Sequence, residues 1–345
     1  MSIYKIFLKP IFFLFDPELV HDFMTSFGRF LGSFYLGRMA TDFVYGYHGR
    51  EISKTIDGIK YKTPFLLSAG FDYNGHLSQI LPHIGLGGEE IGSVTAKPCE
   101  GNPKPRLTRL PKSKGIIVNK GLRNDGVDII IERQKRLPKS DFVKGISIAK
   151  TNCKDASTVE GAIEDYVYSM KRLVEENIGD YYTLNISCPN AYGGEAFIKP
   201  ELLERLLIEI KKINCSKPIY VKMPINISWE QFDSLLVIID KFGLQGVIIG
   251  NLNKDYSYID YRSEAPLQYC GGISGKACAE LSTNLIRKTR DKYKNRFTII
   301  GVGGVMSTKT AQAKFDAGAD LVMLITGLIF EGPGLIRQLC KSVRF

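Results

Sequence analysis

Beyond residue 60, short apolar runs alternate with longer segments in which apolar residues recur every three or four positions. The runs are rich in β-branched residues, which is typical of strands buried on both faces. The longer segments have the period of amphipathic helices. The runs that we interpret as strands are Phe65–Ala69, Glu89–Thr95, Val143–Ala149, Tyr181–Ser187, Ile219–Met223, Gly246–Gly250, Thr298–Val302 and Leu321–Ile325. Helices are expected at Thr158–Glu176, Pro200–Ile213, Ser228–Phe242, Ala277–Tyr293 and Ser307–Ala317.

This repeated alternation predicts the fold class. Eight strand–helix units over about 280 residues have the size and order of an α/β fold of the (β/α)8 TIM barrel type. A doubly wound sheet is the alternative, but it requires a glycine-rich turn near its first strand. The sequence places its glycine-rich segments much later, which favours the barrel.

The first forty residues follow a different pattern. Residues 3–15 are rich in Phe, Leu and Ile but are interrupted by Lys5, Lys9 and Pro10, and residues 19–31 show helical spacing of apolar side chains. We expect two short amphipathic helices, separated at Pro10 and at Asp16-Pro17. Neither approaches the roughly 20 apolar residues of a spanning helix, and no small-residue cleavage site marks a signal peptide. We therefore divide the chain into a helical appendage, residues 1–40, and a barrel, residues 41–345.

The aromatic residues of this appendage leave two interpretations open. The helices pack onto the barrel as ordinary amphipathic elements, or they lie in the interface of a membrane, as the combination of aromatic residues and lysines allows. The aromatic residues concerned are Phe7, Phe12, Phe13, Phe15, Phe23, Phe27 and Phe30.

Composition narrows the function. The 345 residues are 44% apolar and 24% charged, as in an ordinary soluble globular protein. The net charge of +10 is compatible with nucleic acid, an anionic membrane or an anionic ligand. Seven scattered cysteines without a CxxC pair indicate a reducing compartment and no structural metal. All four histidines lie in the first quarter of the chain, which disfavours a histidine-centred hydrolase.

In barrels of this type the chemistry lies at the carboxyl ends of the strands. The residues predicted there are amides, glycines, one lysine and one cysteine, without a carboxylate pair. Two of these segments, with Gly301, Gly303 and Gly304 after the seventh strand and Thr326 and Gly327 after the eighth, have the positions of a barrel phosphate site. The first lacks a GxGxxG pattern, because Met306 occupies the last glycine position. The sequence therefore predicts a site for a planar phosphorylated ligand that is not a dinucleotide.

Several motifs occur in order over residues 4 to 340 and carry a resemblance. They are Phe15-Asp16-Pro17-Glu18 with His21, Ser68-Ala69-Gly70-Phe71-Asp72, Glu90-Ile91-Gly92-Ser93-Val94-Thr95, Gly101-Asn102-Pro103-Lys104-Pro105-Arg106, Asn185-Ile186-Ser187-Cys188-Pro189-Asn190, Gly271-Gly272-Ile273-Ser274-Gly275-Lys276, Ile300-Gly301-Val302-Gly303-Gly304 and Gly318-Ala319-Asp320-Leu321-Val322. With these motifs the chain resembles dihydroorotate dehydrogenase, an FMN-dependent barrel enzyme of pyrimidine synthesis, and especially its membrane-associated class 2, which reduces quinones.

The resemblance implies a set of cofactor residues. FMN would be held at the barrel mouth, with Lys222 at its pyrimidine edge, where a cation favours the anionic reduced flavin. The further residues implied in cofactor binding are Ala69, Gly70, Ser93, Ser147 and Asn185 along the flavin, and Ser274, Gly275, Gly303, Gly304, Thr326 and Gly327 around the phosphate.

It also implies a mechanism and a substrate site. Cys188 has the position of the base that removes a proton while hydride passes to the flavin. Asn185, Asn190 and Asn251 match amides that bind the substrate ring. The implied reaction is oxidation of dihydroorotate to orotate with a quinone as electron acceptor. We expect a peripheral protein on the cytoplasmic side of a membrane, without a cleaved signal or a spanning helix.

The sequence departs from the family pattern at several positions. Class 2 enzymes generally have a serine as base, whereas Cys188 is typical of the soluble class 1. Tyr73 occupies the place of a lysine that contacts flavin and substrate carboxylate, and Val118 that of a substrate-binding asparagine. Leu252 replaces a hydroxyl residue, and Ser147 replaces a flavin-side asparagine. Lys120 is a candidate replacement cation for the substrate.

These departures leave two alternatives to the implied function. One is a related flavin oxidoreductase with a different small substrate, and the other is a non-catalytic FMN-binding protein. Residues 97–123 contain eight basic residues and one acid, which is typical either of a solvated face or of an electropositive lid that attracts an anion. No aromatic interleaving or RNA motif accompanies this charge, and we expect no nucleic-acid partner.

Overall fold

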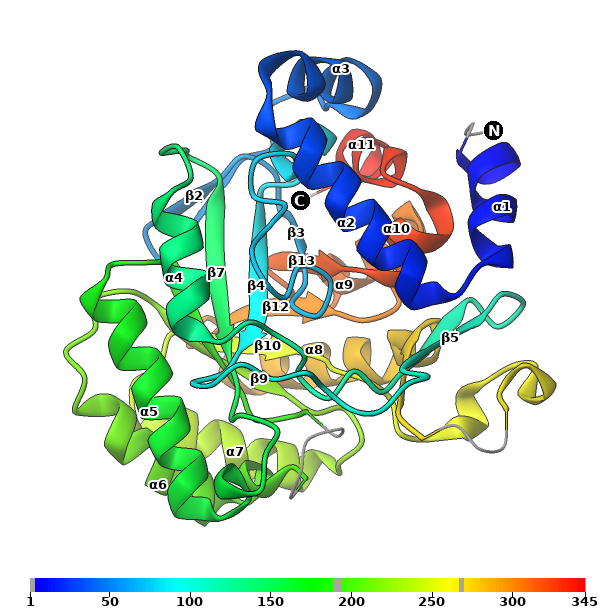
Figure 1. Cartoon of the computed structure of the whole chain (residues 1–345). Coiled ribbons are helices and arrows are strands. Elements are labelled where there is room, and N and C mark those ends of the chain that lie inside the picture. The colour runs from blue at the N-terminus through cyan, green and yellow to red at the C-terminus, as the bar shows by residue number, and fades with distance from the viewer. Residues whose placement is uncertain (1–3, 189–193, 267–269, 345) are drawn as a thin grey trace.

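The structure is a computed structural model that describes residues 4–188, 194–266 and 270–344. Its centre is a closed barrel of eight parallel strands with helices around it (Figure 1). The barrel strands, in the order in which they pair, are β3 (Phe65–Leu67), β4 (Gly88–Val94), β7 (Val143–Ile148), β8 (Tyr181–Asn185), β9 (Ile219–Met223), β10 (Gly246–Ile249), β12 (Thr298–Val302) and β13 (Leu321–Leu324). The predicted TIM barrel is confirmed, and each strand lies within the apolar run that predicted it, or begins one residue before it.

Two apolar layers hold the barrel together. Alternate strand residues fill its interior, where Tyr181 and Tyr220 pack edge to face with ring centroids 5.2 Å apart. The remaining strand residues pack outward against the helices in a second, larger apolar cluster. Because the strands are parallel and in register, their carboxyl ends meet at one end of the barrel, which we call the rim.

The helices between the strands are amphipathic and begin at defined caps. Ser228 and Ser307 each form a capping box at the start of a helix, and Thr158 accepts a bond from the amide of Gly161. The helices of the barrel region are α4 (Val127–Lys135), α5 (Val159–Glu175), α6 (Pro200–Lys211), α7 (Trp229–Lys241), α8 (Ala279–Tyr293), α9 (Thr308–Asp316), α10 (Thr326–Glu331) and α11 (Gly334–Ser342).

Two small sheets were not predicted. A hairpin of β1 (Lys54–Ile56) and β2 (Ile59–Tyr61) covers the amino end of the barrel, where Tyr220 donates a 2.6 Å hydrogen bond to Asp57. At the rim, β5 (Leu107–Leu110), β6 (Gly115–Val118) and β11 (Gly272–Gly275) form a three-stranded antiparallel sheet. Strands of three or four residues with mixed polarity carry little periodic signal, and β11 pairs with a segment far away in sequence.

The amino-terminal segment contains more helix than the sequence predicted. After a π-helical turn (Tyr4–Leu8) come α1 (Lys9–Leu14), α2 (Pro17–Ser33) and α3 (Tyr35–Tyr45). Asp16 caps α2 by accepting bonds from the amides of Glu18 and Leu19, and Pro17 is suited to the first helical turn. Instead of two short helices, α2 has 17 residues and α3 follows at once, so that the boundary expected at residue 40 falls within α3.

The three helices lie together on one side of the barrel, with α2 crossing in front of it (Figure 1). No helix in the described part of the chain combines the length and the apolarity needed to cross a bilayer.

Candidate active site

Two joined cavities open at the rim of the barrel. The larger has a volume of about 170 Å³ and the smaller of about 90 Å³. Both are lined by Ala69, Lys222, Asn251, Leu252, Ser274 and Ile325, so they form one elongated pocket. The smaller cavity lies over the loops after β12 and β13, and the larger extends under α2 and the 97–123 segment.

The smaller cavity has the features of a phosphate cradle. Gly303 and Gly304 have φ of +103° and +74°, and their amides donate to no acceptor among the described residues. A side chain at Gly304 would place its Cβ 2.4 Å from the Cβ of Ala279, so only glycine fits against the start of α8. Thr326 donates a 2.9 Å hydrogen bond to Ser274 across the cavity. Backbone amides without acceptors beside glycines are suited to a phosphate group.

Lys222 lies at the junction of the two cavities. Its side chain, only 4% exposed, projects from β9 and forms a 3.4 Å ion pair with Glu90 and a 3.3 Å bond with Ser68. Glu90 is fully buried, and its other carboxylate oxygen has no partner among the described residues. A buried ammonium held at the pocket floor is suited to the polar edge of a ligand ring.

A chain of hydrogen bonds links the other residues of the floor. Asn185 donates 2.8 Å to Ser93, whose hydroxyl lies 2.8 Å from that of Ser147. Asn251 donates to the carbonyl of Ser187 at 2.7 Å. Ser93, Asn185 and Asn251 line the larger cavity, whereas Ser147 is fully buried behind Ser93 and lines neither cavity. Any effect of Ser147 on a ligand therefore acts through Ser93.

Cys188 is half-buried in the wall of the larger cavity, just beyond β8. Near it Lys150, which follows β7, is 4% exposed and donates 3.3 Å to the carbonyl of Ala156. Burial lowers the pKa of Lys150, and its charge interacts with Cys188 and Asp165. A cation beside a thiol favours the thiolate form.

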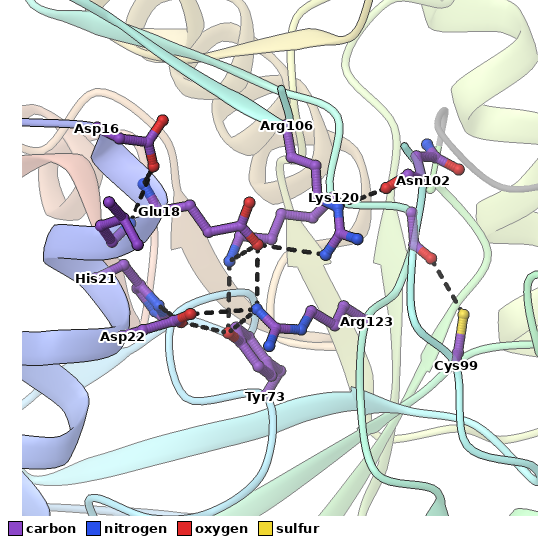
Figure 2. Close-up of polar contacts among 12 residues, drawn as sticks. Asp16, Glu18, His21, Asp22, Tyr73, Cys99, Asn102, Arg106, Lys120 and Arg123 are labelled. Carbon is purple, nitrogen blue, oxygen red and sulfur yellow. Dashed lines mark hydrogen bonds and ion pairs between the residues drawn. The ribbon is translucent and has the colours of Figure 1, made fainter. Parts of the chain in front are cut away.

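Glu18 connects the amino-terminal helices to the pocket. It projects from the first turn of α2, is 3% exposed, and contacts three cations of the 97–123 segment (Figure 2). Its carboxylate lies 3.3 Å from Arg106, 3.6 Å from Lys120 and 3.1 Å from Arg123. Three cations so close to one another repel, and the shared carboxylate is what holds them together.

Tyr73 extends this cluster into the larger cavity, and Asp22 of α2 contacts it from outside the cavity wall. The hydroxyl of Tyr73 donates 3.2 Å to Asp22, and the ammonium of Lys120 lies 3.4 Å from the same hydroxyl and 4.7 Å from the ring centroid. The neighbouring His21 stacks on Tyr73 and bonds the carbonyl of Phe71 at 2.8 Å. Burial lowers the pKa of Lys120 to about 8, although Glu18 and Asp22 oppose the shift.

The structure brings most of the predicted site residues into this one pocket. Those that line it are Ala69, Gly70, Ser93, Lys120, Asn185, Cys188, Lys222, Asn251, Ser274, Gly275, Gly303, Gly304, Thr326 and Gly327. Asn190 lies outside the described residues. The wall near Lys120 is apolar, with Val118, Leu122 and Leu252.

Several residues of the site were not singled out by the sequence. Glu18, Asp22 and Glu90 bind its cations, and Lys150 lies beside its thiol. Glu18 occurred within a family motif, but nothing local indicated that its cations lie 88 or more residues away. Glu90 had a usable signal, because an acid within a buried apolar run requires a cation as partner.

Comparison with known proteins agrees with this geometry. Residues 51–344 match the family model of dihydroorotate dehydrogenase. The chain belongs to the dihydroorotate dehydrogenase family. A dihydroorotate dehydrogenase (quinone) from Christiangramia forsetii is 33% identical over 99% of this chain and 98% of its own length. One from Haemophilus ducreyi is 36% identical over 83% of this chain and 85% of its own.

A solved structure gives the same assignment. The dihydroorotate dehydrogenase of Eimeria tenella in complex with ferulenol superposes with a TM-score of 0.81 at 25% identity, covering 95% of this chain and 90% of that one. The relatives from Christiangramia forsetii and Haemophilus ducreyi are of the quinone type, which supports the class 2 resemblance despite Cys188. Dihydroorotate dehydrogenases are flavin-dependent oxidoreductases that act on a CH–CH group.

Replacing Glu18 by Gln should loosen α2 from the barrel. The substitution keeps the shape of the side chain but leaves the three cations without their shared carboxylate, at a cost of about 3 kcal/mol. We expect hydrogen exchange of the α2 amides to accelerate roughly a hundredfold, since each 1.4 kcal/mol is a factor of ten. Glu160→Gln, which removes an exposed ion pair with Arg205, is the matched control. Unchanged exchange in α2 would show that Glu18 does not hold the helix.

Proposed function

We propose that this protein oxidises dihydroorotate to orotate with bound FMN, and passes the electrons to a quinone at a membrane. One observation carries the substrate class: among the described residues, the wall of the larger cavity contains Lys120, Arg123 and Lys222 but no carboxylate. Such a wall favours an anion, and dihydroorotate carries a carboxylate.

The residues of the smaller cavity fit the phosphate of FMN. The amides of Gly303 and Gly304 have no acceptor among the described residues and are available to an anion, and Ser274 and Thr326 supply hydroxyls. Lys222, which lines both cavities, would then hold the polar edge of the flavin ring, where its charge would favour the reduced anion. When bound, the flavin supplies the acceptor for hydride. The protein residues bind the reactants, orient them and exclude water.

Cys188 is the proposed base. Dehydrogenation removes a proton from one substrate carbon and hydride from its neighbour, so a group that accepts the proton is required. Cys188 is the thiol that lines the larger cavity, and the ammonium of Lys150 interacts with it. Asn185 and Asn251, held by Ser93 and Ser187, are the proposed hydrogen-bond partners of the substrate ring.

Lys120 is the proposed anchor of the substrate carboxylate. Within the cluster of Figure 2, Arg106, Lys120 and Arg123 face only two carboxylates, those of Glu18 and Asp22. One positive charge therefore remains for a ligand, and of the three cations Lys120 and Arg123 line the cavity. The apolar wall of Val118 and Leu252 favours the second candidate, a related flavin enzyme for another small anion.

The amino-terminal helices are the proposed membrane contact and quinone entrance. Their outer face exposes large apolar side chains, including Phe7, Leu14, Phe15, Leu19, Phe23, Phe27, Phe30, Leu36 and Phe43. An apolar patch of this extent is unusual for a protein surface in water and is typical of an interfacial contact. The larger cavity reaches this region between His21 of α2, Leu107 of β5 and Ile329 of α10.

Replacing Cys188 by Ala should separate binding from chemistry. In the absence of oxygen, dihydroorotate should bleach the yellow wild-type protein. Cys188→Ala should keep its flavin, and the rate of bleaching should fall by a factor of about 10² or more. Stopped-flow absorbance measures the rate. Cys270→Ala, which removes an exposed thiol, serves as control. Bleaching at the wild-type rate in Cys188→Ala would exclude Cys188 as the base.

Replacing Lys120 by Met should weaken orotate binding about tenfold or more, because a charge-assisted bond to the carboxylate is lost. Orotate affinity is read from the perturbation of the flavin absorbance. Since only protonated Lys120 binds the anion, wild-type affinity should be complete below pH 8 and fall above it. Lys97→Met, at an exposed lysine paired with Asp155, should behave as wild type. If orotate does not change the flavin absorbance of the flavin-loaded wild-type protein, the second candidate function is favoured.

Replacing Phe27 by Gln should reduce binding to vesicles of anionic phospholipid about tenfold, as expected for the loss of about 1.5 kcal/mol of apolar burial. Ile208→Gln is the matched control, because Phe27 and Ile208 are each 45% exposed and only Phe27 lies on the amino-terminal helices. Cosedimentation with vesicles measures both. Equal binding of the two variants would remove α2 from the proposed contact.

A further inference from the structure

Lys314 is a buried lysine that the proposed reaction does not use. It projects from α9, is 1% exposed, and donates hydrogen bonds to the carbonyl of Ala279 at 3.1 Å, to the hydroxyl of Thr283 at 2.8 Å and to that of Ser282. No carboxylate among the described residues forms an ion pair with it. An ammonium buried without a counter-charge is costly, because hydrogen bonds satisfy its protons but leave its charge uncompensated.

The position of Lys314 suggests what its buried charge does. The hydroxyl of Ser282, which Lys314 bonds, lies 3.2 Å from the point where a Cβ would stand on Gly303. The side chain of Lys314 itself packs beneath Gly301 at the end of β12. Lys314 thus lies directly behind the glycine loop whose other face is the phosphate cradle.

We propose that Lys314 is the counter-charge for the phosphate of the bound cofactor, acting through Ser282 and the Gly303–Gly304 loop, and that phosphate binding holds Lys314 in its protonated form. This inference rests on the proposed FMN site and makes Lys314 a positioning residue, since it does not line the pocket. The bond formed on protonation is an N–H bond, and the proton comes from solvent.

The surroundings of Lys314 are consistent with a charge that depends on the ligand. Burial lowers the pKa of Lys314 to about 7, so that without an anion the side chain is only partly charged near neutral pH. The titratable group that faces it is Cys278, from the turn before α8, and burial raises the pKa of that thiol to about 12. Cys278 is therefore neutral and supplies no counter-charge. The adjacent part of α8 presents hydroxyls and a carbonyl, and β12 presents Gly301.

The affinity for FMN should depend on pH through Lys314. A phosphate dianion on the other face of the loop favours protonated Lys314 and raises its pKa. FMN binding is therefore accompanied by proton uptake above pH 7. Between pH 7 and 9, the affinity for FMN should therefore fall as the pH rises. The second ionisation of a phosphate monoester lies near pH 6, outside this range.

The test compares Lys314→Met with Lys309→Met, an exposed lysine on the same helix. The fluorescence of flavin released on dilution of the holoprotein gives the dissociation constant for FMN between pH 7 and 9. In wild type and Lys309→Met, we expect the dissociation constant to rise about fivefold over this range. A pKa shift of one unit limits the full change to about tenfold, and half of Lys314 is already uncharged at pH 7 without FMN. In Lys314→Met the affinity for FMN should be about fivefold weaker than in wild type at pH 7 and independent of pH.

Riboflavin, which lacks the phosphate, separates an electrostatic role from a structural one. It should bind Lys314→Met as well as wild type. Folding should survive the substitution, because Ser282 still donates to the carbonyl of Cys278 at 2.8 Å and Thr283 to that of Ala279 at 2.6 Å. Thermal unfolding of Lys314→Met and of Lys314→Gln checks this point.

Two results would overturn the inference while sparing the proposed function. One is wild-type FMN affinity and pH dependence in Lys314→Met, and the other is an equal loss of riboflavin and FMN in that variant. A wild-type protein that retains no FMN at any pH would instead contradict the proposed function, and with it this inference.

Discussion

A single buried carboxylate connects the two parts of this molecule. Glu18 belongs to the first turn of α2, while its three cationic partners belong to the segment that covers the rim. Without this carboxylate, Arg106, Lys120 and Arg123 would repel one another at the mouth of the barrel. Together with the bonds of Asp22 to Arg123 and Tyr73 and of His21 to the carbonyl of Phe71, this carboxylate fixes the position of the apolar helices relative to the covering segment and the larger cavity. If α1–α3 contact a membrane, the ion pairs of Glu18 connect that contact directly to the substrate pocket.

The pocket itself is an arrangement of buried positive charge. Lys222 on the floor has one carboxylate partner, Lys120 shares its carboxylate with two arginines, and Lys150 lies beside a thiol. Lys222 thus has a carboxylate of its own, whereas Lys120 shares one and Lys150 faces a thiol, so the positive charge of the pocket is only partly compensated. Such a site gains most when an anion enters, and it discriminates against neutral molecules of the same shape.

The fold was predictable from the sequence because its signal is local. Buried parallel strands are continuous apolar runs, and the loops after β12 and β13 are marked by glycines such as Gly303 and Gly304. The sheet of β5, β6 and β11 was missed because its strands are short and because β11 pairs with β6 across more than 150 residues. The partners of Glu18 and Lys314 were missed for the same reason. A charged residue has the same pattern in sequence on the surface and in a buried cluster, and only the folded chain distinguishes them.

The hairpin of β1 and β2 determines from which end reactants can enter the barrel. Tyr61, the last residue of β2, is fully buried in one cluster with Tyr181 and Tyr220. These side chains close the amino end of the barrel. In the described part of the chain, the cavities that reach Lys222 lie at the rim, at the opposite end of the barrel. Substrate, product and electron acceptor would then share one opening, and the cations that Glu18 holds, Lys120 and Arg123, line it.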